Sequence, residues 1–444
     1  MSKLGLLLPP LIALIAASAA HAQLLGGPLG GVTRPVTGVI GQVGNTVEGV
    51  AGVPIGPREQ SRIIAPSLDR VVTPLALVEA SASQLAELRR LRLDALVRAN
   101  RAVLARDTDG QPVRKGELIV TDPDPATLSL AIRSGFRLLG DETAGELGMR
   151  LVTLAVPGGM NVNEALKRLR KVAPRLEADY NHVYEPAGGS LLPAAATRLA
   201  AAPRLDQNIR IAMIDGGVAT HPSLARASIE QRGFAGPAQP TGHGTAIGSL
   251  LVGEEGAFSG AARGVQLFVG DVYGGNPAAG SATAIIRALA WAASKRPAVI
   301  NISLVGPQNR ALARAVAALR AKSIPLVAAV GNDGPAAPPQ YPASYEGVIA
   351  VTGVDARDRA LVEAGRAKHL DFAAPGADMA AALPGEGYTR VRGTSFAAPF
   401  VSARLAVART AAKLAREAVP GKGRVGRGII CRYCRVAPGQ VGLR

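Results

Sequence analysis

Short, almost unbroken apolar runs in the second half of the chain constrain its fold more than any other feature. Five of them follow one another between Ile209 and Val354: IRIAMI, VQLFVGDV, VINISLV, PLVAAV and VIAVTGV. A strand that is apolar at every position suits a parallel sheet, because such a sheet is covered on both faces. Helical patterns at 281–294 and 310–322 separate the runs as crossover helices. The sequence therefore predicts a doubly wound, mainly parallel α/β domain.

A different rhythm precedes this domain, between Glu117 and Glu185. It consists of a strand ELIVT, a helix from about Pro125, extended FRLL and RLVTLAV, a helix from Asn161 and a last strand near Leu176. The order βαββαβ predicts a small ferredoxin-like α+β domain. The order alone says nothing about function, because this small fold supports many.

The remaining segments are distinguished by composition. The first 22 residues have a Lys, an apolar stretch and Ala20-His21-Ala22, as in an export signal. No later stretch has the roughly 18 uncharged apolar residues of a membrane span, so we expect a secreted chain, periplasmic or extracellular, with no transmembrane segment in its mature form. The expected division is a signal peptide (1–22), a Gly-rich linker (23–65), a helical spacer (66–115), the small domain (116–186), an exposed linker (187–207), the α/β domain (208–420) and a basic tail (421–444).

The formal net charge of +17 raises the possibility of nucleic-acid binding. The arginines are scattered singly among alanines, however, and no recognition motif accompanies them, so a basic, solvated surface without a specific nucleic-acid partner is expected. The two cysteines, Cys431 and Cys434, are too few for a zinc site. A short disulfide and two incidental thiols both remain open.

Three segments place a reactive side chain where a strand ends or a helix begins. Asp215 ends an apolar strand before two glycines, His243 lies in GHGT before an apolar helix, and Ser395 lies in GTSFAAP before an Ala-rich helix. Each residue alone has an ordinary explanation, such as a turn aspartate or an N-cap serine. An α/β-hydrolase would carry its serine in G-x-S-x-G, but here the fifth position is Ala397 and no acid-then-His pair follows.

In sequence and in order, the three segments resemble the Asp, His and Ser motifs of the subtilisin-like serine proteases. Further matches between Asn208 and Arg416 are HPSL, NISL, AAVGNDG and AAPG. The resemblance implies a serine endopeptidase acting on proteins or peptides. It implies a catalytic triad of Asp215, His243 and Ser395, an oxyanion hole formed by Asn332 and Ser395, and substrate binding by Ser303, Leu304, Gly306, Ala329 and Gly331.

The resemblance also implies that the domain at 116–186 is a propeptide that inhibits the enzyme within the same chain. We expect cleavage in the linker 187–207, with a mature chain beginning near Leu205 to Ile209. No cofactor and no metal site are expected; a structural calcium ion stays open, but VGEEGAFSG at 252–260 matches no familiar calcium loop of the family. Gly216 and Ala246 depart from the family pattern without removing the triad. A peptide-binding pseudoprotease and a basic nucleic-acid-binding protein are the alternative functions.

Overall fold

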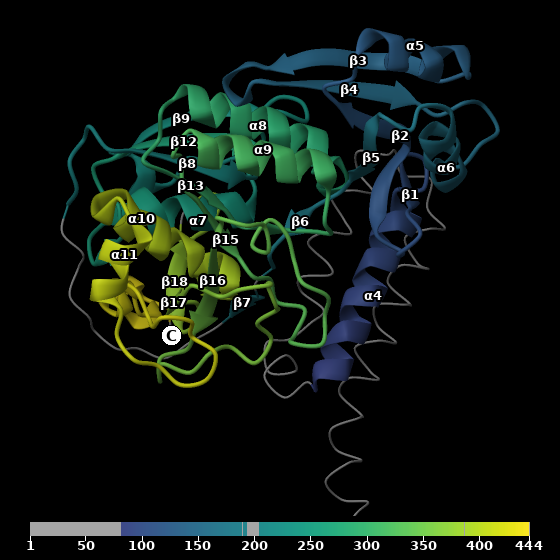
Figure 1. Ribbon diagram of the computed structural model, residues 1–444. Coiled ribbons are helices and arrows are strands. Elements are labelled where there is room, and N and C mark those ends of the chain that lie inside the picture. The colour runs from purple at the N-terminus through teal and green to yellow at the C-terminus, as the bar shows by residue number, and fades with distance from the viewer. Residues whose placement is uncertain (1–80, 189, 193–203, 386, 444) are drawn as a thin grey trace, which may run out of the picture.

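The computed structural model describes residues 81–188, 190–192, 204–385 and 387–443 of the chain. The predicted signal peptide and Gly-rich linker lie outside the described residues. Figure 1 shows a small sheet with two helices above a larger α/β domain, and helix α4 (Ala82–Ala99) running along one side. Within the described ranges, none of the helices combines the length and apolarity that a membrane crossing requires.

The larger domain is built on a seven-stranded sheet in which every pairing is parallel, in the order β17-β16-β15-β13-β8-β12-β9. Its strands are β8 (Arg210–Asp215), β9 (Ser228–Gly233), β12 (Gln266–Asp271), β13 (Val299–Ile302), β15 (Leu326–Ala329), β16 (Ile349–Val354) and β17 (Phe372–Pro375). The predicted doubly wound fold is confirmed.

Helices cover both faces of this sheet (Figure 1). Ile211 and Met213 of β8 pack in a cluster with α7 (Gly242–Val252) and α10 (Ala398–Ala408). Ala212 and Ile214 pack in a second cluster, with α8 (Ala282–Ser294) and α9 (Arg310–Ala321). Successive side chains of one strand thus enter opposite cores, which explains why the runs are apolar at every position.

The smaller domain is an antiparallel sheet with two helices on one face. Its elements are β1 (Leu104–Arg106), β2 (Pro112–Thr121), α5 (Pro125–Arg133), β3 (Arg137–Ala144), β4 (Met149–Ala155), α6 (Val162–Val172) and β5 (Glu177–His182). The βαββαβ order is present from β2 to β5. The sheet begins earlier than the sequence analysis expects, because Asp107 accepts hydrogen bonds from the backbone of Asp109 and Gln111 and closes a hairpin within the predicted spacer.

The two domains share one hydrophobic cluster. Ile119 and Leu151, on the face of the small sheet away from its helices, pack together with α8 and α9. Asp179 accepts a hydrogen bond from the backbone N–H of Arg310 at the start of α9 (2.8 Å), and Asn181 accepts one from Thr283 at the start of α8 (3.2 Å). The first amides of a helix lack helical partners, so these polar side chains complete both helix starts.

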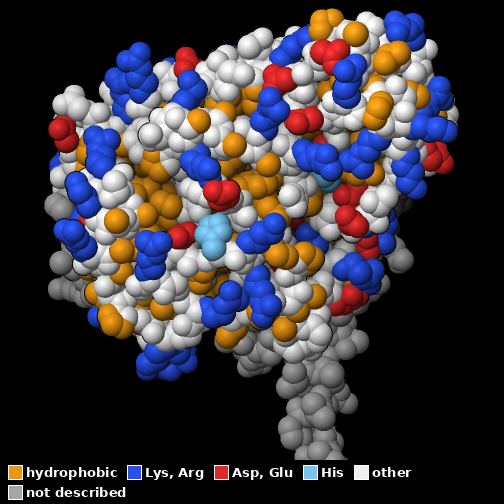
Figure 2. Space-filling model, viewed as in Figure 1, with side chains coloured by type: hydrophobic (Ala, Val, Ile, Leu, Met, Phe, Trp, Pro, Cys, Tyr) orange, Lys and Arg blue, Asp and Glu red, His pale blue; other side chains and the backbone are white. Residues whose placement is uncertain are grey.

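The C-terminal tail packs back onto the larger domain. Ile429 bridges to Ala373 of β17 and to Val419. Cys431 and Cys434 are buried and joined by a disulfide, which decides between the two possibilities that the sequence left open. Figure 2 shows Lys and Arg side chains dispersed over the face viewed, with acidic, apolar and neutral groups between them, rather than gathered into one patch.

Candidate active site

Asp215 and His243 meet at the carboxyl end of the parallel sheet. Asp215 is fully buried at the end of β8, and its Oδ1 lies 2.8 Å from His243 Nδ1. His243 is the second residue of α7, whose N-cap Thr241 accepts a hydrogen bond from Gly244 N–H at 2.9 Å. A Cβ at Gly244 would clash with the backbone of Gly216. The glycines beside both residues therefore let the start of α7 approach the end of β8.

A second buried acid, which the sequence analysis does not identify, lies beside Asp215. Asp271 ends β12 in register with Asp215. It accepts hydrogen bonds from the backbone N–H groups of Tyr273 (2.8 Å), Gly274 (3.0 Å) and Gln239 (2.8 Å). Burial raises the pKa of Asp271, and the negative charge of the neighbouring Asp215 raises it further. The three backbone hydrogen bonds lower this pKa, but they do not outweigh burial. Its signal in the sequence is that VQLFVGDV, like the run before Asp215, is apolar up to an aspartate.

Ser395 lies in a short 3-10 turn, Thr394–Phe396, immediately before α10. The preceding Gly393 has a φ of 148°, a conformation that favours glycine. Ser395 is fully buried, and its hydroxyl makes no hydrogen bond to the described part of the chain. The Phe396 ring lies 5.5 Å from the imidazole of His243, so the serine turn and the imidazole are neighbours.

A buried polar chain fixes the serine turn to the sheet. Ser303 Oγ donates to the backbone oxygen of Ser395 (3.0 Å), Asn301 Nδ2 donates to Ser303 Oγ (3.1 Å), and Ser402 Oγ donates to Asn301 Oδ1 (3.0 Å). All four residues are fully buried. Because each of these contacts satisfies a buried polar group, the network stabilises one position of the turn.

Asn332 faces the same turn from the loop after β15. Its Oδ1 accepts a hydrogen bond from Thr394 N–H (2.9 Å), and Thr394 Oγ1 accepts one from Gly331 N–H (3.0 Å). Its Nδ2 donates to the backbone oxygens of Ala187 and Gly188. One end of the amide is therefore anchored to the serine turn, and the other binds carbonyl oxygens of the segment that follows the small domain.

That segment, residues 184–188, follows the small domain and runs between β14 (Leu304–Val305) and Asn332; the space that it fills is called the cleft below. Its β6 (Glu185–Pro186) pairs antiparallel with β14. Ala187 N–H donates to the backbone oxygen of Ser303 (2.8 Å), and Tyr184 N–H donates to that of Gly280 (2.7 Å). Of the five residues predicted to bind substrate, Ser303 and Leu304 thus contact this strand through their backbone.

The other three predicted residues have different surroundings. Gly306 pairs with Tyr341 and leaves room for the fully buried Tyr184, since a Cβ on Gly306 would lie 2.5 Å from the Tyr184 ring. Ala329 is buried in the core of the larger domain, and Gly331 contacts Thr394. Within the described ranges, neither residue forms a hydrogen bond with residues 184–188.

After Gly188 the chain again pairs with a strand of the larger domain. Residues 190–192 form β7 (Ser190–Leu192), which pairs antiparallel with β19 (Tyr388–Arg392). Strand β19 also pairs with β18 (Met379–Ala382) and leads directly to the serine turn. The chain is therefore fixed by backbone pairing on both sides of Gly188.

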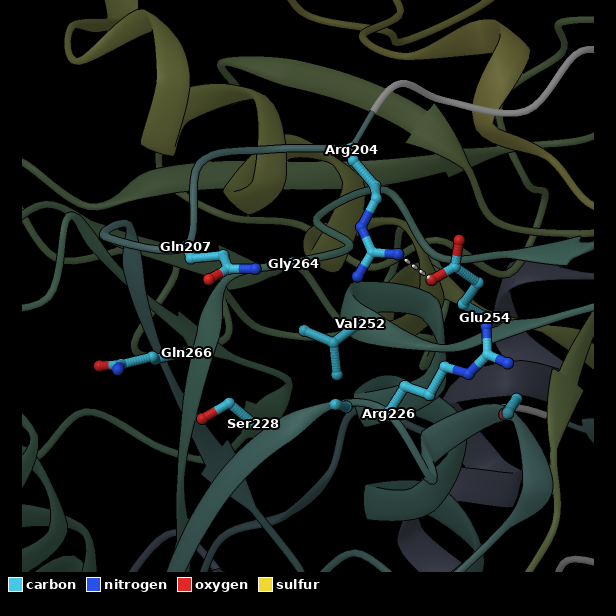
Figure 3. Close-up of a pocket in the computed structure, with 10 residues that line it drawn as sticks. Arg204, Gln207, Arg226, Ser228, Val252, Glu254, Gly264 and Gln266 are labelled. Atoms are coloured by element: carbon cyan, nitrogen blue, oxygen red, sulfur yellow. Dashed lines mark hydrogen bonds and ion pairs between the residues drawn. The ribbon is translucent and has the colours of Figure 1, made fainter.

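Two further features lie outside this cleft. A cavity of about 230 Å³ is lined by residues such as Gln207, Arg226, Glu254 and Gln266, and by none of the predicted site residues (Figure 3). Glu254 in this cavity pairs with Arg204 at 2.8 Å and with Arg263 at 2.7 Å. Among the described residues, no group of three or more His, Cys, Asp or Glu side chains is placed to hold a metal ion.

Comparison with known proteins gives consistent results. Residues 206–419 match the model of the Subtilase family. Subtilisin Savinase of Lederbergia lenta is 31% identical over 209 residues, which are 45% of this chain and 75% of that protein. The major intracellular serine protease of Bacillus subtilis (strain 168) is 32% identical over 45% of this chain and 68% of its own length. The match to the alkaline protease of Alkalihalobacillus alcalophilus, at 31% identity over 45% of this chain, spans 53% of that protein.

Among solved structures, fervidolysin from Fervidobacterium pennivorans, a keratinolytic enzyme related to subtilisin, has a TM-score of 0.62. The likeness covers 75% of this chain and 62% of the fervidolysin chain at 18% identity, and it shows the fold alone.

Proposed function

The chain belongs to the subtilase family of serine-type endopeptidases, and we propose that it hydrolyses peptide bonds with Asp215, His243 and Ser395 as its catalytic triad. The observation that carries this assignment is the 2.8 Å contact between the Asp215 carboxylate and the His243 imidazole, beside the serine turn. A strand of the chain's own backbone lies in the adjoining cleft, which supports a peptide substrate.

The chemistry of peptide hydrolysis assigns a role to each group. Ser395 Oγ is a weak nucleophile at neutral pH, so His243 accepts its proton as the hydroxyl attacks the carbonyl carbon. The acyl-enzyme forms as His243 returns the proton to the leaving amine, and water then hydrolyses the ester by the same route. Asp215 holds the imidazole in the required tautomer and stabilises the imidazolium.

The negative charge that develops on the carbonyl oxygen needs donors that are already in position. The Asn332 side chain and the Ser395 backbone N–H are the groups proposed for this oxyanion hole. Support comes from Asn332 Nδ2, which donates to the backbone oxygen of Ala187, and from its Oδ1, which is tied to the serine turn. The amide does not have to reorganise as the charge forms.

The first substrate in this proposal is the chain itself, cut between Ala187 and Gly188. Ala187 N–H bonds to Ser303 and its carbonyl oxygen to Asn332, so the bond that follows this carbonyl is the one presented to Ser395. The bond lies at the start of the linker 187–207. A mature chain beginning near Leu205 to Ile209 then requires a second cut.

The small domain acts as an inhibitory propeptide by holding residues 184–187 in the cleft. Export of the chain is proposed from the signal-like residues 1–22.

Two measurements test the proposal. The full chain is expressed as wild type and as Ser395→Ala, and both are analysed by intact mass and N-terminal sequencing. We expect a new N-terminus at Gly188 in the wild type and no cut in the variant. Identical cleavage in both would assign processing to another protease, and an uncut but active wild type would show that the small domain is not inhibitory.

A fluorogenic peptide assay, with and without a serine-directed covalent inhibitor, then examines the activity itself. Hydrolysis that the inhibitor abolishes is expected. Peptide binding without hydrolysis would favour a pseudoprotease, and a salt-dependent gel shift without hydrolysis would favour a nucleic-acid-binding protein.

A further inference from the structure

Arg392, three residues before Ser395, forms a buried ion pair with Glu363 in the loop between β16 and β17. Its Nη2 donates to Glu363 Oε2 at 2.9 Å, and its Nε lies 2.8 Å from Glu363 Oε1. The two side chains are only 11% and 2% exposed. A planar guanidinium that contacts both oxygens of one carboxylate has a fixed orientation. The end of β19 is therefore fixed to Glu363 immediately before the serine turn.

The loop of Glu363 is bound in turn to the loop after β15 that carries Asn332. Gly365 N–H donates to the backbone oxygen of Gly331 at 2.7 Å, and Gly334 N–H donates to that of Glu363 at 2.8 Å. A Cβ on Gly365 would lie 2.5 Å from the backbone oxygen of the residue before Gly331, so glycine permits this close approach. The backbone on both sides of Asn332 is therefore held by the loop that bears the carboxylate.

These contacts form a closed ring around the proposed oxyanion hole. The side chain of Arg392 joins β19 to Glu363, and the backbone of that loop holds the loop of Asn332. Asn332 Oδ1 completes the ring, because it accepts the N–H of Thr394, two residues after Arg392 (2.9 Å). Within the described residues, the hydroxyl of Ser395 bonds to neither member of the ion pair. Any effect of the pair on the chemistry must therefore act through the backbone that it holds.

The physical chemistry of buried ion pairs indicates what this one supplies. Such a pair adds little stability compared with apolar side chains of similar volume, because both charges must be removed from water. Its two parallel hydrogen bonds do fix a distance and an angle between the segments that carry them. A displacement of about 1 Å at a catalytic group can cost about 10²-fold in rate. Fixed geometry is thus worth more here than the stability of the pair.

We propose that Arg392 is a positioning residue that, through its ion pair with Glu363, holds the amide of Asn332 where negative charge develops beside Ser395. The proposal rests on the proposed function and adds a role for two residues outside the triad and the oxyanion hole. Arg392 also pairs through its backbone with Ser190, the third residue after the proposed cut. The strand that aligns the chain after the cut is thereby tied to the loop of the oxyanion donor.

The experiment is a double-mutant cycle on the full chain after self-processing, with active enzyme counted by a covalent serine inhibitor. The substrate is a peptide aminocoumarin amide, which has no residue after the cut bond and so makes no strand pairing with β19. The pair variant, Arg392→Met with Glu363→Met, removes both charges together and leaves no buried charge uncompensated. We expect its kcat to fall on the order of tenfold, with KM nearly unchanged.

The same pair variant is then made in an Asn332→Ala background. There it should change kcat by less than about twofold, because the amide through which the pair acts is absent. An equal loss of kcat in both backgrounds would overturn the inference, and so would an unchanged kcat in the presence of Asn332. Both results would leave the proposed function standing. A wild type that hydrolyses no peptide would overturn both.

The matched control is Arg404→Met with Glu417→Met. Arg404 Nε and Nη2 donate to the two oxygens of Glu417, at 2.7 and 3.0 Å, in a second pair of the same kind that involves α10 rather than the serine turn. This control should keep the wild-type kcat in both backgrounds. If the pair variant does not fold, Arg392→Lys replaces it, since a lysine keeps the charge but cannot make two parallel bonds. The same difference between the two backgrounds is then expected, with a smaller loss of kcat.

Discussion

Asp215 and Asp271 end neighbouring parallel strands in register, and both carboxylates are fully buried at the same edge of the sheet. The first contacts the imidazole of His243. The second accepts the backbone N–H of Gln239, in the turn that leads to α7 and His243. Asp215 thus contacts the proposed base His243 directly, while Asp271 holds the turn that precedes His243 in the chain.

This pair predicts a pH dependence of stability. Burial and, to a lesser extent, Asp215 raise the pKa of Asp271. Between about pH 4, where a free aspartate titrates, and this raised pKa, the folded chain binds more protons than the unfolded one. The contribution of Asp271 to the free energy of unfolding is therefore present below about pH 4 and is lost as the pH rises through this window.

The test is chemical denaturation from about pH 4 to about pH 7 in a Ser395→Ala background, which prevents self-digestion. Asp271→Asn should be less stable overall, because one backbone donor loses its acceptor, but its stability should fall less steeply with pH. Equal slopes in the two proteins would mean that Asp271 ionises as readily in the folded chain as in the unfolded one.

Asn332→Ala should lower kcat on the order of 10² to 10³-fold with little change in KM, because the amide donor acts on charge that exists only in the transition state. Steady-state kinetics on a fluorogenic peptide measures this, and a thermal unfolding scan controls for lost folding. An unchanged kcat would show that Asn332 only stabilises the turn and does not act as an oxyanion donor.

Gly306→Ala should weaken the binding of an aromatic side chain at the fourth position before the cut bond. An added Cβ would lie 2.5 Å from the ring of Tyr184, and overpacking of this kind costs about 1–3 kcal/mol. We expect the kcat/KM ratio for peptides with Tyr over Ala at that position to fall about tenfold or more relative to the wild type. A ratio equal to that of the wild type would place the aromatic side chain elsewhere.

Replacing both Arg89 and Arg92 by Gln should shorten the delay between self-cleavage and peptide hydrolysis, because Asp333 and Glu185 would lose the cations that hold them together. We expect about tenfold weaker inhibition by the released segment, measured as the time course of activity. Arg90→Gln is the control on the same helix, since Arg90 is exposed and pairs within α4 with Glu87 and Asp94. Equal delays in the two variants would exclude a role for the helix in inhibition.

Local patterns were sufficient for the parallel sheet and for the meeting of Asp215 with His243. Strands such as β8 are apolar at every position because their side chains enter two cores, and this is visible in the sequence. The glycines around Asp215 and His243 mark a close backbone approach, and they too are visible.

Other features depend on contacts between distant segments. The role of Asp271 follows from the register of β12 with β8, and the ion pair of Arg92 with Asp333 joins residues 241 positions apart. The hydrophobic periodicity of the sequence predicts neither contact. The sequence pattern does not reveal strand β1, because the hairpin that Asp107 closes interrupts a stretch rich in Leu and Arg.

The pairing of β6 with β14, and of β7 with β19, holds the chain on both sides of Gly188. While the chain is continuous, residues 184–187 face the cleft at the high effective concentration of an intramolecular ligand. Cutting the bond after Ala187 breaks no hydrogen bond of β6, but it makes the segment a separate molecule whose occupancy depends on dilution. The rate of activation would then be set by dissociation of the cleaved segment rather than by cleavage. The enzyme would therefore stay inhibited longer at a high protein concentration than at a low one.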